Sequence, residues 1–406
     1  MTKSQMRWVI ALLLFLATAV NYADRQALSI VSKTIRGEFG MTEVDYSRVV
    51  ATFFLAYAIM YAGSGYIVDR LGTKKGFAFF ISLWSLAAMS HALARGTWTF
   101  GICRFFLGLG EPGNWPAAAK AIQEWFPAKQ RALGVGLFNA GSSLGSMVSP
   151  PLISWLTYQY GWKFAFVAVG AIGLVWLVFW LGIYYTPKPD ADEPEEVLPR
   201  PKIDWAKLVL SHDCLAITFA RTLTDPVIYF VIFWLPEYLQ KERHFDLAMV
   251  GKYSWVPFLF GGIGYTLGGW LSGWLMERGV DMPVARKRIM LIGAACLPVA
   301  IAAPLVPTAA LAIGATCFIT FGHGFWVANL QTLPTDLFRR HEVGTVSGFS
   351  GMGGALAGAV ANLGTGYVVQ HFSYSPVFLL AGILHPMGMV IIWKMLPNER
   401  FRHSLR

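Results

Sequence analysis

The sequence predicts an all-α integral membrane protein with twelve transmembrane helices, arranged as two pseudo-symmetric six-helix halves. Three observations support this fold class: an apolar composition, twelve apolar stretches of membrane length, and an internal repeat. Of the 406 residues, 55% are hydrophobic and 14% are charged, and the mean hydropathy is +0.50. A soluble domain usually has about 25% charged residues, because water must solvate its surface. The composition therefore excludes a soluble enzyme and predicts a chain embedded in a lipid bilayer.

Twelve stretches have the length that a transmembrane helix needs, which is about 20 mostly apolar residues. The predicted spans are 8–30, 46–68, 76–94, 98–123, 132–156, 162–185, 210–236, 249–276, 289–306, 308–333, 343–369 and 374–396. Lys3 and Arg7 precede the first stretch as they would in a signal peptide, but the stretch continues into residues 21–25 without a convincing cleavage site. We therefore expect a retained first helix.

The distribution of basic residues predicts the orientation of the chain. With a cytoplasmic N-terminus, 21 of the 33 Lys and Arg residues fall on the cytoplasmic side, eight fall outside and four lie within spans. Cytoplasmic loops of membrane proteins collect Lys and Arg, so we expect both termini in the cytoplasm. The same bias explains the net charge of +10 without a nucleic-acid partner, which would require a basic soluble module.

A polar segment divides the chain near its middle. Residues 186–207 contain five prolines and a run of acidic residues, a composition that favours a linker over a packed core. We therefore expect an N-terminal six-helix half at 1–185, a cytoplasmic linker at 186–208 and a C-terminal six-helix half at 209–406.

The two halves carry matching sequence. The loops at 65–72 and 273–279 each have a small residue, an acid and an arginine four and five positions later, and then a glycine. At an offset of 212 residues, 136–144 aligns with 348–356, and 124–126 aligns with 336–338. Duplicated halves are typical of secondary transporters, whose ligand site lies near the midplane between the repeats.

Five stretches of the chain resemble motifs of a known family. The loop at 65–74 (GYIVDRLGTK) resembles the signature of the major facilitator superfamily, and 273–279 resembles its second copy. Residues 21–25 (NYADR) and 104–116 (RFFLGLGEPGNWP) look like the anion:cation symporter family within it, and 221–239 resembles bacterial hexuronate transporters. The resemblance covers essentially the whole chain. It implies proton-coupled uptake of an anionic sugar, such as a hexuronate, by alternating access across a bacterial inner membrane.

Four ionisable residues within spans are candidates for function. Asp24 and Arg25 lie late in the first span, and Arg104 and Glu111 lie two helical turns apart in the fourth. A charge at this depth costs several kcal/mol unless it is paired or hydrated. Arginines can hold a substrate carboxylate through two hydrogen bonds, and buried acids can exchange protons. The alternative is that these four residues only pair with one another and hold two spans together.

The resemblance also implies roles for individual residues. It implies that Asp24 and Glu111 couple transport to protons, and that Arg25, Arg104, Tyr22 and Tyr57 contact the substrate. For a lone tyrosine in a span, packing is the competing interpretation. In the C-terminal half we expect substrate contacts from polar or aromatic residues of spans ten and eleven, namely Trp326, Asn329 and Ser350.

Other polar residues in the C-terminal half have two open interpretations. Arg221 and Asp225 are four residues apart, so they either neutralise each other or form a second part of the site. His323 is either a core histidine or a second titrating group. At the offset of 212, His323 falls on Glu111 and Thr316 falls on Arg104. The C-terminal half has therefore lost the acid–arginine pair, which favours proton coupling in the N-terminal half.

The loop motifs predict gating residues, and the remaining patterns predict what the protein lacks. We expect Asp69 and Arg70, with Glu277 and Arg278, to stabilise one conformation through contacts with neighbouring helix ends. The four cysteines show no metal-ligand or redox spacing, and we expect no cofactor or metal. The expected partners are the sugar acid, protons and the lipid bilayer, and the expected state is a monomer.

Three other functions compete with the symporter. An integral-membrane enzyme could use Asp24 and Glu111 as an acid and a base, but the sequence lacks a metal-ligand pattern, a phosphate loop and a nucleophile–base pair. A sensor would need a signalling domain larger than the 186–208 linker. An uncoupled facilitator or exchanger of organic anions is the main alternative.

Overall fold

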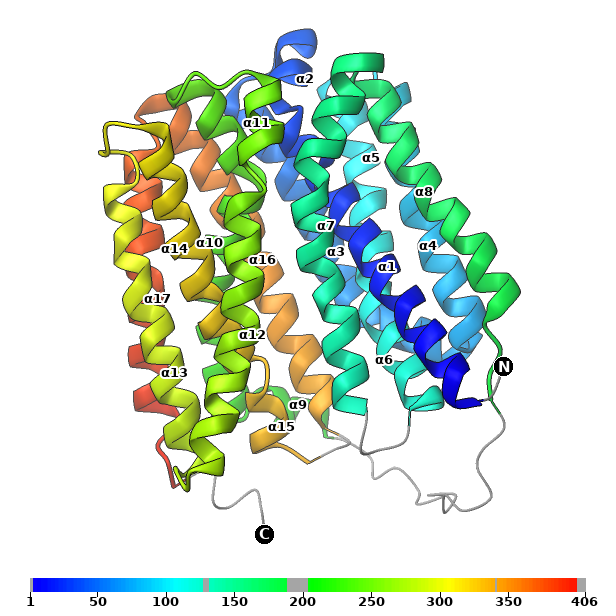
Figure 1. Ribbon diagram of the computed structural model, residues 1–406, viewed down its shortest axis with the longest axis vertical. Coiled ribbons are helices and arrows are strands. Elements are labelled where there is room, and N and C mark those ends of the chain that lie inside the picture. Colours follow the sequence, from blue (N-terminus) through cyan, green and yellow to red (C-terminus); the bar gives the residue numbers. More distant parts are fainter. Residues whose placement is uncertain (1–2, 127–130, 188–203, 340–341, 400–406) are drawn as a thin grey trace.

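The computed structural model describes residues 3–126, 131–187, 204–339 and 342–399, and these residues form helices without any strand. The membrane-length elements of the N-terminal half are α1 (Lys3–Ile30), α3 (Glu43–Leu71), α4 (Thr73–Ser90), α5 (Thr97–Gly110) continued by α6 (Asn114–Trp125), α7 (Arg131–Tyr160) and α8 (Trp162–Ile183) (Figure 1). Those of the C-terminal half are α10 (His212–Glu242), α12 (Val256–Glu277), α13 (Met282–Cys296) continued by a 3₁₀ helix (Leu297–Ala302), α14 (Ala309–Leu330), α16 (Val343–His371) and α17 (Ser375–Met395). Shorter helices connect them: α2 (Ser32–Phe39), α9 (Trp205–Val209), α11 (Leu247–Tyr253) and α15 (Leu333–Leu337).

These twelve elements correspond one to one with the twelve predicted spans, so the predicted fold class is confirmed. Among the described helices, eight are long and apolar enough by themselves to cross a membrane. The other four elements, α5–α6, α7, α12 and α13, are interrupted, short, or rich in glycine and polar residues.

Several predicted boundaries are displaced. Helix α10 ends at Glu242 rather than near residue 236, and α12 begins at Val256 rather than near residue 249. Helix α13 begins at Met282 rather than near residue 289, and it includes two basic side chains that are bound by the protein. Arg286 pairs with Asp336 at 3.1 Å, and Lys287 donates to the carbonyl of Leu396. Because these cations have protein partners, the helix extends beyond the apolar stretch.

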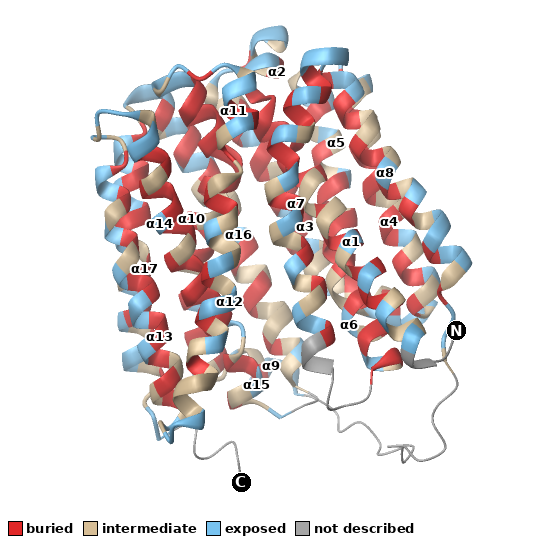
Figure 2. Cartoon of the chain, in the orientation of Figure 1, coloured by how far each residue is buried: buried red, intermediate tan, exposed pale blue. Residues whose placement is uncertain are grey.

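The two halves stand side by side, and α8 ends at the same end of the molecule at which α9 begins (Figure 1); residues 188–203 of the predicted linker lie outside the described residues. We call this end of the molecule the linker end, and the opposite end, which carries α2 and α11, the α2 end. Buried segments concentrate where helices face one another, and exposed segments lie around the outside (Figure 2). The exposed residues include many large apolar side chains. Leu12, Ile59, Val178 and Phe318 are each more than half exposed, as expected for side chains that face lipid rather than water.

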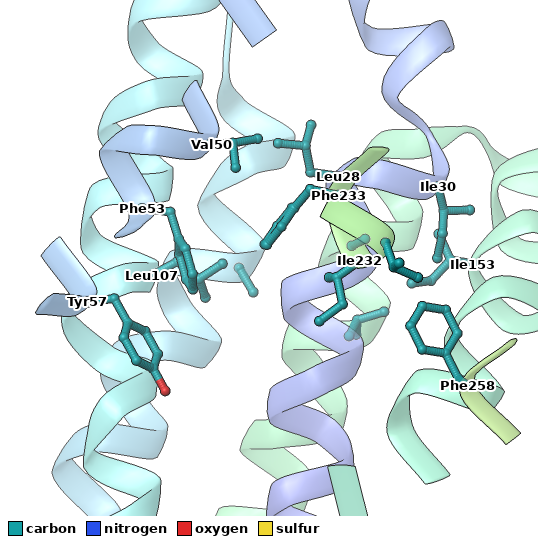
Figure 3. Packing of buried hydrophobic residues seen from close by; sticks show 14 of the residues in the cluster. Leu28, Ile30, Val50, Phe53, Tyr57, Leu107, Ile153, Ile232, Phe233 and Phe258 are labelled. Carbon is teal, nitrogen blue, oxygen red and sulfur yellow. The ribbon is translucent and has the colours of Figure 1, made fainter. Parts of the chain in front are cut away.

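The distribution of buried apolar residues shows where the halves join. The larger cluster contains residues of both halves, including Phe53 of α3 and Phe233 of α10, which lie near each other in Figure 3. A second cluster belongs to the C-terminal half alone and includes Leu208, Trp326 and Ile392 toward the linker end. The halves therefore share a core toward the α2 end and have separate cores toward the linker end.

Polar contacts also join the halves at the α2 end, and we call this group the outer latch. Arg36 of α2 forms ion pairs with Glu237 of α10 and, at 3.0 Å, with Glu43 of α3. Lys241 of α10 pairs with Glu43 at 2.7 Å, and the hydroxyl of Tyr46 donates to the carbonyl of Phe233 at 2.7 Å. Burial lowers the pKa of Arg36, but the carboxylates of Glu237 and Glu43 offset this and raise it, so Arg36 stays charged.

Reversing the charges of the latch tests its contribution. Arg36→Glu or Glu237→Arg alone should lower the melting temperature of the purified protein, because each places like charges together at a buried site. Removing one partner of a buried pair typically costs about 3–5 kcal/mol. The double exchange should recover most of this loss. Arg48→Glu is the control, because its side chain is 67% exposed and surface pairs contribute about 1 kcal/mol at most. A double variant that is less stable than both single variants would contradict the pairing.

Candidate functional site

A break in the fourth span positions the acid that the sequence singled out. Helix α5 ends at Gly110, and a 3₁₀ turn of Glu111, Pro112 and Gly113 leads into α6. The proline lacks a backbone N–H, which favours a change in the hydrogen-bonding pattern there. A Cβ atom on Gly113 would lie 2.0 Å from the ring of Phe80, so only glycine permits this close approach. The turn directs Glu111 toward α1.

Arg25 of α1 and Glu111 form a buried ion pair. The Arg25 Nε and Nη2 atoms donate to Glu111 Oε2 at 2.9 and 2.7 Å, and the two side chains are 4% and 0% exposed. The guanidinium carbon also lies over three aromatic rings, at 4.8 Å from Tyr22, 4.9 Å from Tyr57 and 5.5 Å from Phe53. A carboxylate and three ring faces thus compensate one cation that has left water.

Asp24 and Arg104 are equally buried but poorly satisfied. Their residues are 1% and 0% exposed. Arg104 Nη1 donates a weak hydrogen bond to the Arg25 carbonyl at 3.4 Å. Its Nε and Nη2 atoms, and both carboxyl oxygens of Asp24, have no hydrogen-bond partner among the described residues. Unsatisfied buried groups of this kind are costly and concentrate where function requires them.

Tyrosines from both halves surround this charge cluster. Tyr57 accepts a hydrogen bond from the Trp115 indole at 3.0 Å, and its ring centroid lies 5.5 Å from that of Tyr61. Tyr229 of α10 packs against Phe54 of α3, with ring centroids 4.5 Å apart. Tyr22, Tyr61 and Tyr229 are all partly exposed. Tyrosines of the two halves therefore lie on neighbouring helices, and the rings of Tyr22 and Tyr57 face Arg25.

The C-terminal half contributes a second charged pair. Arg221 Nε donates to Asp225 Oδ2 at 3.0 Å, as the i,i+4 spacing allows, and Arg221 Nη1 approaches Ser350 Oγ at 3.5 Å. A Cβ atom on Gly351 would lie 2.9 Å from the Tyr61 ring and 3.2 Å from Arg221 Nη1. Arg221 and Ser350 therefore lie close to Tyr61 of the N-terminal half.

Two expected substrate residues lie elsewhere. Trp326 is fully buried, donates to Thr224 Oγ1 at 3.0 Å and packs against His385. Asn329 donates to the carbonyls of Gly268 and Phe325 at 3.2 and 3.0 Å. Their polar groups are thus bonded inside the C-terminal half, and the structure does not bring them to the charge cluster.

The expected gating residues lie at the linker end and are exposed. Asp69 pairs with Lys120 at 2.8 Å, and the Arg278 guanidinium lies 3.8 Å from the Trp274 ring centroid. Arg70 and Glu277 are also exposed there.

Several polar residues were not predicted from the sequence. Besides those of the outer latch, they include His385, which lies 3.1 Å from His323, and the Arg286–Asp336 pair. The internal repeat could have indicated the Arg286–Asp336 pair, because the offset of 212 residues aligns Asp336 with Glu124. Glu124 accepts hydrogen bonds from Thr73 at 2.5 Å and from Tyr184, so both acids tie neighbouring helices together near the linker end.

Comparison with known proteins identifies the family. The profile described as Major Facilitator Superfamily matches residues 14–362. The chain belongs to this superfamily. A solved bacterial homolog of the human lysosomal transporter Spinster, in an inward-facing and unoccupied conformation, shares the fold of this facilitator. Its TM-score is 0.75 at 18% identity, and the match covers 98% of this chain and 94% of the homolog.

The curated proteins that are similar to this facilitator in sequence are named as transporters. The hexuronate transporter of Escherichia coli (strain K12) is 32% identical over 97% of this chain and 95% of the relative. The galacturonate transporter of Dickeya chrysanthemi is 32% identical over 71% and 88%, and the hexuronate transporter of Bacillus subtilis (strain 168) is 29% identical over 92% and 90%. The predictions of a multi-pass membrane transporter and of a chain that is not an enzyme are confirmed.

The contact at Gly113 gives a prediction for the stability of this facilitator. Gly113→Ala should lower the melting temperature, because the new methyl group overlaps the Phe80 ring and overpacking typically costs about 1–3 kcal/mol. Gly101→Ala, in α5, is the matched control, since a Cβ atom there has no neighbour within 4 Å. Equal melting temperatures for the two variants in the same detergent would show that the close approach does not hold the break in place.

Proposed function

We propose that this facilitator is a proton-coupled symporter that carries an anionic sugar, a hexuronate or a closely related sugar acid, by alternating access. The observation that carries the proposal is the contrast between two buried arginines. Arg25 is paired with Glu111, whereas Arg104 keeps two nitrogens without a partner among the described residues. The names of the relatives, which include hexuronate and galacturonate transporters, support this substrate class.

The substrate carboxylate binds the arginines, and its hydroxyl groups bind the tyrosines. A planar guanidinium matches a carboxylate through two parallel hydrogen bonds. Tyr22 and Tyr57, whose rings already face Arg25, offer hydroxyl groups to a sugar. Ser350, next to Arg221, closes the site from the C-terminal half. Trp326 and Asn329 are left out of the proposed site because they are bonded elsewhere.

Proton coupling follows from the two acids. A buried carboxylate without a partner is strongly disfavoured, so Asp24 holds a proton in the conformation described here. When a substrate carboxylate takes the place of Glu111 on Arg25, Glu111 loses its counter-charge and binds a proton in turn. Substrate and proton then enter and leave together, because each compensates the charge that the other changes.

The shared core and the outer latch join the halves at the α2 end, and we propose that transport from this conformation opens the site toward the linker end. With the linker end in the cytoplasm of a bacterial cell, both termini are cytoplasmic and the site faces inward from the inner membrane. Asp69, Arg70, Glu277 and Arg278, exposed at the linker end, make their gating contacts in the opposite state. The site requires neither a cofactor nor a second copy of the chain.

Transport in proteoliposomes tests the proposal against an uncoupled facilitator or exchanger. We expect labelled glucuronate and galacturonate to accumulate above equilibrium when an inward proton gradient is imposed, and to equilibrate only when a protonophore is added. Uptake that ignores the gradient would favour a facilitator. Uptake that requires an anion inside the liposomes would favour an exchanger.

Arg104→Lys should weaken substrate binding by about tenfold or more, although it conserves the charge. Lysine is a point donor and cannot form the paired hydrogen bonds of arginine, and a hydrogen bond to a charged group contributes about 1.5–3 kcal/mol. Titration calorimetry of the purified variant measures the effect, with the exposed Arg48→Lys as the control. Unchanged affinity would exclude Arg104 as the anchor.

Asp24→Asn separates proton coupling from simple charge pairing. The variant imitates a permanently protonated acid, so exchange of labelled for unlabelled substrate should continue while proton-driven accumulation is lost. If Asp24 instead neutralises Arg104, the variant should lose about 3–5 kcal/mol of stability while the folded fraction keeps its accumulation. The measurement compares exchange and accumulation in liposomes that contain equal amounts of folded protein. Full accumulation would refute the coupling role.

A further inference from the structure

A pocket far from the charge cluster lies between the beginning of α13 and the end of α17. Its volume is about 380 Å³, and it is lined by Val284, Lys287, Arg288, Leu291, Trp393, Pro397 and Asn398. Both helix ends belong to the linker end of the C-terminal half (Figure 1). The pocket therefore lies where a transmembrane helix meets the surface of the bilayer.

The charge of the lining points to an anion. Its two charged residues, Lys287 and Arg288, are both cations, and they differ in burial and in their contacts. Lys287 is 8% exposed and donates to the Leu396 carbonyl and, at 2.8 Å, to Asn398 Oδ1, so it holds the end of α17 in place. Arg288 is exposed and forms no hydrogen bond or ion pair with the described residues. Its guanidinium is available for a ligand.

The apolar part of the lining distinguishes a lipid from a soluble anion. Leu291 is 41% exposed and Trp393 is 50% exposed. Leu291 follows Arg288 in α13, and Trp393 lies in α17 before Pro397, so both are on the parts of these helices that run into the membrane. Tryptophan is enriched at the level of lipid head groups. A soluble anion would contact Arg288 but not Leu291 and Trp393, whereas a phospholipid would contact the cation with its head group and the apolar side chains with an acyl chain.

We propose that this pocket binds an anionic phospholipid, with the head-group phosphate on Arg288 and the upper part of an acyl chain against Leu291 and Trp393. Basic pockets between transmembrane helices are suited to such head groups. The bound lipid bridges α13 and α17 and stabilises the C-terminal half. The proposal does not depend on which substrate the facilitator carries.

Native mass spectrometry and thermal unfolding in detergent test the proposal with three probes: phosphatidylglycerol, phosphatidylcholine and glycerol 3-phosphate. We expect phosphatidylglycerol to bind as a discrete adduct and to raise the melting temperature. We expect phosphatidylcholine, which lacks net charge, and glycerol 3-phosphate, which lacks acyl chains, to do neither. An equal effect of phosphatidylcholine would refute the role of charge, and an equal effect of glycerol 3-phosphate would identify a soluble-anion site instead.

Variants locate the site on the protein. Arg288→Gln should weaken phosphatidylglycerol binding about fivefold, the effect expected for one basic residue near an anionic surface. Arg288→Lys should retain most of the binding. Arg278→Gln is the matched control, because it removes an exposed cation from the same end of the same half without touching the pocket. Equal weakening by Arg288→Gln and Arg278→Gln would show diffuse attraction to the surface and would overturn the proposal.

Discussion

The buried ion pair between Arg25 and Glu111 is the interaction on which the arrangement of the N-terminal half depends. Two charges at bilayer depth are tolerated only with close geometry and further polar contacts. The break after Gly110, the close contact of Gly113 with Phe80, and the rings around Arg25 all serve that geometry. In the proposed transport cycle a substrate carboxylate takes the place of Glu111 on Arg25 and accepts hydrogen bonds from the same guanidinium. Under that proposal the structural pair is also part of the transport site.

The acid of this pair has no acidic counterpart at the repeat-related position of the C-terminal half, although the two halves share a fold. The counterparts of Arg104 and Glu111 are Thr316 and His323. Thr316 donates to the Ala312 carbonyl of its own helix at 2.9 Å, and His323 bonds to His385. Both side chains are thus satisfied within the C-terminal half. This asymmetry supports the proposal that charge exchange takes place in the N-terminal half, with Arg221 and Ser350 lining the site from the C-terminal half.

The sequence predicted the spans well because apolar length is a local property. The sequence left open whether Asp24, Arg25, Arg104 and Glu111 pair with one another, and the structure pairs Arg25 with Glu111. Asn329 and Trp326 were expected to contact the substrate because they bring polar and aromatic groups into span ten, but in the structure these groups have protein partners. Asn329 donates to the Phe325 carbonyl four residues earlier in its helix. The sequence spacing does not show whether an asparagine amide makes such a bond or stays free for a ligand. Arg36 and Glu237 are 201 residues apart, and their pairing depends on how two helix ends meet, which no local pattern encodes.

The two kinds of contact at the α2 end have different consequences for opening it. Exposing a buried aromatic residue such as Phe53 or Phe233 to water costs about 1.5–3 kcal/mol. The charges of Arg36, Glu43, Glu237 and Lys241 regain hydration when they separate, so breaking the latch is largely offset. Ion pairs beside an apolar contact therefore join the halves at the α2 end at a smaller net cost of separation than a wholly apolar interface would have. The proposed alternating access needs such a balance, because a wholly apolar interface would hold the halves in one state.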